Sequence, residues 1–201
     1  MASTAAHRST GWGIGVLAAA IVSRHTVDPY HVWMAATALA AYWGATAPDW
    51  LEQAWWSSGR GERLWITHRT WTHWGLAWIA LLLFCYAHLG RHDFAGPGFG
   101  FAAGGVTHLL ADWPNPLGVP WLLTKRYSLR WWKSGRCDML VVLAVWAAAL
   151  ATSDQVWWHG QLSRHGFALG SKVVAALPTP WNTSWSTAWS TAWNTCLRSW
   201  V

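Results

Sequence analysis

The length of the apolar runs constrains this chain more than any other feature of its sequence. Five segments, at about 11–23, 31–47, 73–90, 98–113 and 138–153, are rich in apolar residues, and polar residues, glycine or proline bound each of them. Runs of this length are typical of helices and not of strands. Of the 201 residues, 53% are hydrophobic and only 11% are charged, a balance unusual for a soluble domain. We therefore predict an all-α, polytopic membrane helical bundle with four to five apolar helices.

The number of crossings is left at four or five because most segments are shorter than the ~20 residues that a perpendicular span needs. A short segment can thin the bilayer or lie partly in the interface. Gly11 and Gly15, and again Gly100 and Gly104, have the small-xxx-small spacing that lets helix backbones approach closely. The alternative is that these pairs are accidental in a chain with 18 glycines.

The formal net charge of +6 does not indicate nucleic-acid binding, because the basic residues lie between apolar segments and form no stripe. Membrane lipids with anionic headgroups are the expected partners. If all five segments cross, the N-terminus and the loops at 48–72 and 114–137 share one side, which holds most of the arginines and lysines. The positive-inside rule then places the N-terminus in the cytoplasm and the C-terminus outside. The sequence predicts no oligomeric state.

The last part of the chain differs in composition from the rest. Tryptophan recurs every four residues at Trp181, Trp185, Trp189 and Trp193, among serine, threonine and asparagine. This pattern indicates either a helix lying in the membrane interface or a low-complexity tail without a role. We expect a membrane-embedded domain over 1–155 and a Trp-rich C-terminal tail over 156–201.

Ionisable residues at the ends of apolar helices are costly and are therefore candidates for function. His108 and Asp112 stand four residues apart at the end of the fourth segment, so on a helix they share one face. Imidazole and carboxylate in this arrangement suit a divalent metal. The alternative is a hydrogen-bonded pair that only stabilises the helix end.

Further histidines and carboxylates belong to the same predicted side of the membrane. His7 precedes the first segment, and Asp49 follows Pro48 at the end of the second. His68 and His73 lie in the sequence ITHRTWTH, where Thr72 is expected to cap the third helix and to place His73 in its first turn. Histidines and carboxylates with unrelated structural roles would be expected on both sides of the membrane. We therefore treat these residues as a candidate site.

The chain resembles a known family at these positions. His7 with Gly11, then PDWLE, HRTWTH, HLLADWPNPLGVP and RYSLRWWKSGRCD, resemble the ordered motifs of the YdjM-type predicted membrane-bound metal-dependent hydrolases. The resemblance covers residues 5–150 and implies a multi-pass protein of the bacterial inner membrane with a metal-dependent hydrolytic site. Leu51 and Glu52 stand where that family usually has a second aspartate and a histidine.

These observations define the predicted site. The metal ligands are His7, Asp49, His68, His73, His108 and Asp112. Mixed imidazole and carboxylate ligands fit zinc, with manganese or iron as alternatives. Glu52 or Asp138 is expected to act as general base. Arg69 either stabilises developing negative charge or pairs with a nearby carboxylate.

The predicted function is hydrolysis of a phosphoester or acyl bond in a lipid-like substrate at the cytoplasmic face. Two alternatives belong to other classes of protein. One is a non-catalytic membrane protein in which the metal only fastens the helices, and closed coordination without water would favour it. The other is a metal-ion transporter, whose ligands should line a path through the bilayer.

Overall fold

The computed structural model describes residues 3–26, 32–56, 71–122, 125–131 and 138–159, with side chains described up to Leu51 in the second of these stretches. Within these residues the chain is all-α and contains no β-strand. The six helices are α1 (Thr4–Val22), α2 (Val32–Gly44), α3 (Ala47–Trp56), α4 (Gly75–Ala87), α5 (Ala95–Asp112) and α6 (Asp138–Trp157).

All five apolar segments predicted from the sequence form helices, which are α1, α2, α4, α5 and α6. Two predictions about the flanking residues are wrong. α1 begins at Thr4, well before its apolar run, because the Ser3 side chain accepts a hydrogen bond from the Ala6 amide and caps the helix. His7 therefore lies inside the helix and not before it. The region predicted as a loop after residue 48 contains α3, which the search for apolar runs misses because this helix has polar residues along one side.

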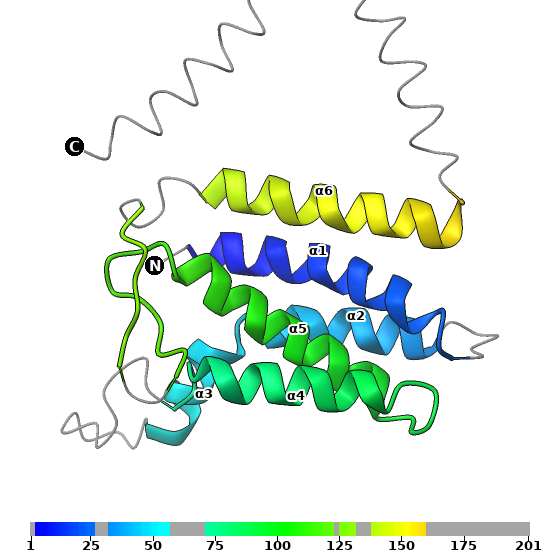
Figure 1. The fold of residues 1–201 in the computed structure, drawn as a ribbon, viewed down its shortest axis with the longest axis horizontal. Coiled ribbons are helices and arrows are strands. Elements are labelled where there is room, and N and C mark those ends of the chain that lie inside the picture. The colour runs from blue at the N-terminus through cyan, green and yellow to red at the C-terminus, as the bar shows by residue number, and fades with distance from the viewer. Residues whose placement is uncertain (1–2, 27–31, 57–70, 123–124, 132–137, 160–201) are drawn as a thin grey trace, which may run out of the picture.

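The helices form a bundle in which α5 packs against α1, α2 and α4, while α6 lies along α1 at the edge (Figure 1). α6 runs parallel to α1. At one end the Asp138 carboxylate accepts a hydrogen bond from the Ser3 amide, and at the other the Trp157 indole donates to the Ser23 hydroxyl over 3.1 Å. The starts of both helices therefore lie at the same end of the bundle.

Close backbone contact between α2 and α5 depends on glycine. A Cβ added to Gly100 would collide with the Thr37 carbonyl, and one added to Gly104 would collide with the Ala41 carbonyl. On α1, a Cβ at Gly11 would lie 2.8 Å from the Ala45 side chain. The predicted small-xxx-small packing is thus confirmed, and it draws the end of α2 against the part of α5 that carries the candidate ligands.

Among the described residues, α6 is the one helix both long and apolar enough to cross a membrane, and α4 is a shorter apolar helix. Only a small share of α6 is buried inside the bundle, so most of its apolar surface faces outward. A multi-pass arrangement built from the other helices stays a prediction.

The start of α4 differs from the prediction. Thr72 does not cap this helix, which begins at Gly75 and has Trp74 in the cap position without a side-chain hydrogen bond. Instead the Gly75 and Leu76 amides donate to carbonyls of a distant loop, those of Pro120 and Trp121, over 3.0 and 3.1 Å. These bonds satisfy amides that a helix leaves unpaired at its start. His73 consequently precedes α4 and does not lie in its first turn.

Candidate metal centre

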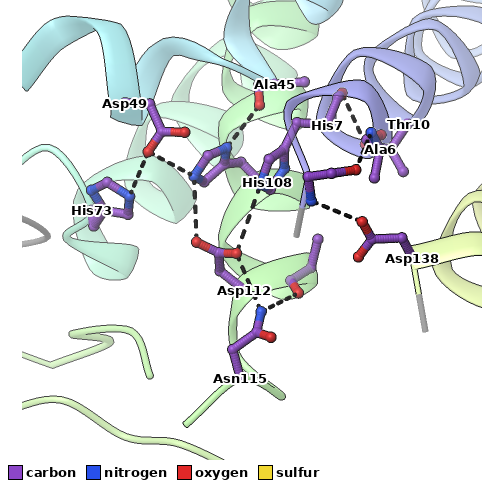
Figure 2. A network of polar contacts seen from close by, with 12 residues as sticks. Ala6, His7, Thr10, Ala45, Asp49, His73, His108, Asp112, Asn115 and Asp138 are labelled. Atoms are coloured by element: carbon purple, nitrogen blue, oxygen red, sulfur yellow. Dashed lines mark hydrogen bonds and ion pairs between the residues drawn. The ribbon is translucent and has the colours of Figure 1, made fainter. Parts of the chain in front are cut away.

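Five of the six predicted ligands come together at one end of the bundle, from four different segments (Figure 2). His7 comes from the first turns of α1 and Asp49 from α3, while His73 immediately precedes α4. His108 and Asp112 come from the last turns of α5. His68, the sixth predicted ligand, lies outside the described residues.

His108 lies at the centre of the group and is completely buried. Its Nδ1 is 2.8 Å from the Ala45 carbonyl oxygen at the end of α2. Because a carbonyl only accepts hydrogen bonds, Nδ1 must carry the proton, and the lone pair of the neutral ring lies on Nε2. The backbone of α2 therefore fixes both the orientation and the tautomer of His108, as partners behind metal-binding histidines commonly do.

The remaining side chains direct nitrogen and oxygen atoms toward this Nε2. The Nε2 of His108 lies 3.6 Å from Asp49 Oδ1 and 3.8 Å from Asp112 Oδ2. His73 Nε2 is 3.5 Å from Asp49 Oδ1, and His7 Nε2 is 3.7 Å from Asp112 Oδ1. These distances are long for hydrogen bonds. They are close to the ~3.4 Å that separates two ligand atoms of a tetrahedral ion when each bond is ~2.1 Å.

Several of these atoms are buried without a hydrogen-bond partner. They are the Nε2 atoms of His7 and His108 and the Oδ1 atom of Asp49. Burying a polar atom without a partner costs free energy, so such atoms are uncommon in folded proteins, and three in one place require an explanation. Divalent cations bind imidazole nitrogens and carboxylate oxygens, so this set of donors fits a divalent metal.

The ligand atoms form two groups, each within 4.8 Å, and both groups include His108. One consists of His7, His108 and Asp112, and the other of Asp49, His73 and His108. A ring nitrogen has a single lone pair, so His108 Nε2 can bind one ion only. The two groups therefore describe either one ion with several protein ligands or two ions of which only one binds His108.

The three histidine rings also contact one another. The His7 and His108 rings stack with centroids 3.9 Å apart, and His73 meets His108 edge-on at 5.3 Å.

Burial acts to raise the pKa of the Asp49 carboxyl, but His73, His108 and His7 outweigh burial and hold this pKa below its usual value. Asp49 is therefore a carboxylate at neutral pH, which is the form that binds metal.

The five described candidate ligands differ in their exposure to solvent. The side chains of His73, His108 and Asp112 are fully buried and that of His7 nearly so, whereas the Asp49 side chain is 33% exposed. Asp49 thus marks the side from which water or another molecule can approach. Four candidate ligands are buried and Asp49 is partly exposed, so a metal bound here could also bind an exchangeable ligand beside Asp49.

Asn115 is a candidate that sequence reasoning missed. It is fully buried, and its side-chain amide points toward Asp112 Oδ1 at 3.4 Å and toward the Ala111 carbonyl at 3.3 Å (Figure 2). An amide behind a carboxylate ligand restricts the rotation of that carboxylate. Its spacing in the sequence could have indicated it, because Asn115 follows Asp112 by three residues within the same motif.

Of the three predicted catalytic residues, the structure describes the side chain of Asp138 only. Glu52 follows Asp49 by three positions in α3, but its side chain lies outside the described part of the chain, as does Arg69 altogether. Asp138 begins α6, and Figure 2 shows its carboxylate turned toward the start of α1 and apart from the histidines. Its Oδ2 accepts a hydrogen bond from the Ser3 amide over 2.8 Å.

Comparison with protein families places the whole candidate site within a known family. The model of a family described as YdjM inner membrane protein matches residues 1–179, which include every candidate residue discussed above. No curated protein and no solved structure matches the chain.

Proposed function

Because the chain belongs to the YdjM inner membrane protein family, we propose that it is a multi-pass membrane hydrolase that depends on a divalent metal. In this proposal the site hydrolyses a phosphoester or acyl bond of a lipid-like substrate at the cytoplasmic face. The observation that carries the proposal is the convergence of three buried imidazoles on two carboxylates at one end of the bundle.

The outer surface of the bundle supports a position in the membrane. Large apolar side chains are exposed on several helices, among them Leu39 on α2, Leu83 and Phe84 on α4, and Met139 and Leu150 on α6. An apolar surface spread over so many elements is unusual for a protein surrounded by water. At 19 and 18 residues, α1 and α5 have lengths of about 29 and 27 Å, close to the ~30 Å hydrocarbon core of a bilayer.

Exposed tryptophans support a site at the level of the lipid headgroups. Trp43, Trp50 and Trp71 are exposed and come from segments next to the candidate ligands. Trp157 and Trp158 are exposed at the other end of α6. Tryptophan favours the two membrane interfaces, so this distribution is expected of helices that cross from one interface to the other. A site at this level would meet the polar end of a lipid.

The ligand set favours zinc, with manganese and iron as alternatives. When bound, such an ion supplies a Lewis acid and lowers the pKa of a water molecule toward ~7. The chain would contribute the remaining steps. Glu52 would accept the proton of the attacking water, and Arg69 would pair with the negative charge that develops on the substrate. We assign the base to Glu52 and not to Asp138, because the Asp138 carboxylate is already bonded to the backbone of α1.

A structural metal site is the second candidate, and the complete burial of His73, His108 and Asp112 favours it. Transport has less support, because the five described ligands gather in two overlapping groups, each within 4.8 Å, and are not spread along the helices.

The test compares wild-type protein with Glu52→Gln in detergent, using phospholipids and isoprenoid phosphates as substrates. Gln keeps the size of the side chain and removes its basicity, so the variant should retain metal and fold while turnover falls by ~100-fold or more. Unchanged turnover would refute the assignment of the base. Bound metal without hydrolysis of any of these substrates would refute the enzyme and favour the structural site.

A further inference from the structure

The contact between α6 and the start of α1 has a consequence for the candidate metal centre. Ser3 precedes α1, and its side chain caps the helix by accepting from the Ala6 amide over 3.2 Å. The Ser3 carbonyl accepts from the His7 amide over 3.0 Å. Ser3 thus contacts the first turn through both its side chain and its backbone, and the position of His7 depends on where Ser3 lies.

The backbone amide of Ser3 is bound by Asp138. The Ser3 amide donates to Asp138 Oδ2 over 2.8 Å, across 135 positions of sequence. Because α1 and α6 are parallel, the positive ends of their helix dipoles lie together, and the Asp138 carboxylate lies at the start of both helices. Negative charge in this position stabilises each helix end and reduces the repulsion between them.

Apolar packing continues the same contact toward the metal ligands. Val141 and Val142, in the first two turns of α6, pack against the buried Ala6 and Ala111. Ala6 precedes His7 and Ala111 precedes Asp112, so the start of α6 covers the backbone that carries two members of one ligand group. α6 contributes no ligand to either group, yet it lies against this one.

We propose that Asp138 is a positioning residue that holds the start of α1 through Ser3 and thereby places His7 in the metal centre. The assignment rests on the proposed metal site, and it gives Asp138 a role other than the general base predicted from the sequence. The two roles differ in what they require. A base requires a carboxylate of suitable basicity, whereas a positioning residue requires a hydrogen-bond acceptor at this place.

The test uses Asp138→Ala, Asp138→Asn and the control Trp157→Phe in the full chain. Asn keeps the acceptor and loses the basicity, Ala loses both, and Phe removes only the bond to Ser23 at the far end of α6. Zinc affinity, measured by competition with a chelator, should fall about 10- to 100-fold in Asp138→Ala. It should stay within about threefold of wild type in Asp138→Asn, which loses only the charge effect, and be unchanged in Trp157→Phe.

Two further measurements make the outcome decisive. In a His7→Ala background, Asp138→Ala should cause no additional loss of zinc affinity, because the effect acts through His7. In metal-free protein, amide exchange of the first turn of α1 should be faster in Asp138→Ala and unchanged in the other two variants.

Wild-type exchange and wild-type zinc affinity in Asp138→Ala would overturn the proposal. A second result would also overturn it. If both Asp138→Asn and Asp138→Ala keep wild-type zinc affinity but lose turnover, Asp138 behaves as a general base. If wild-type protein binds no divalent ion, the proposed function fails, and the exchange measurement still decides whether Asp138 fixes the start of α1.

Discussion

At the scale of single residues, the buried group is organised by partners that are not themselves ligands. The Ala45 carbonyl holds His108, the Asn115 amide restrains Asp112, and Ser3 holds the turn that carries His7. Such partners act by keeping each ligand atom directed at one point, so that little side-chain entropy is lost when metal binds.

Asn115→Ala should lower metal affinity by about 10- to 100-fold while leaving metal-free protein folded, because Asp112 loses the amide that restrains it. Chelator competition on detergent-purified protein measures the affinity, and circular dichroism checks the helix content. Exposed Leu117, two residues further along, provides a control as Leu117→Ala, which should bind metal as tightly as wild type. Equal affinity for all three proteins would mean that Asn115 only packs.

The sequence indicates residues of this group to different degrees. The spacing of His108 and Asp112 is enough to place both on one face of a helix, since helical periodicity is local. The sequence assigns His7, Asp49 and His73 to one side of the membrane, but it does not show that their side chains meet in one cluster. The contact of Ala45 with His108 spans 63 positions and involves a backbone carbonyl, which leaves no mark in the residue types.

At the scale of elements, the approach of α2 to α5 determines where His108 lies. Glycines at positions 100 and 104 allow backbone contact, and the same contact brings the Ala45 carbonyl within bonding distance of the imidazole. The helices themselves follow from their apolar runs. Their starts do not, because α4 is completed by carbonyls of Pro120 and Trp121, which lie far along the chain from its first amides.

Gly104→Ala should destabilise the protein by about 1–3 kcal/mol, because the new methyl group collides with the Ala41 backbone and α2 must move away. The displacement should also weaken metal binding by separating Ala45 from His108. Gly13→Ala is the matched control, since its Cβ would meet side chains and no backbone, with Val145 at 2.9 Å and Trp146 at 3.5 Å. Thermal unfolding in detergent measures the stability, and equal melting temperatures for the two variants would contradict this account of the α2–α5 contact.

At the scale of the whole molecule, the bundle separates two kinds of surface. Its outside is apolar over several helices, and its buried candidate ligands gather at one end. The all-α class and the apolar helices could be predicted because hydrophobicity is visible in the sequence. α3 could not, since a helix with one polar side does not stand out from a loop by its apolar content.

The metal content of the purified full-length protein tests the central claim most directly. Elemental analysis should find at least one divalent ion per chain in wild type and in His92→Ala, whose exposed ring lies in the loop between α4 and α5, away from the ligands. His108→Ala should lose that ion, because both ligand groups contain this residue. Equal metal content in wild type and His108→Ala, or no metal in wild type, would contradict a metal centre and leave the buried histidines and carboxylates as a structural network.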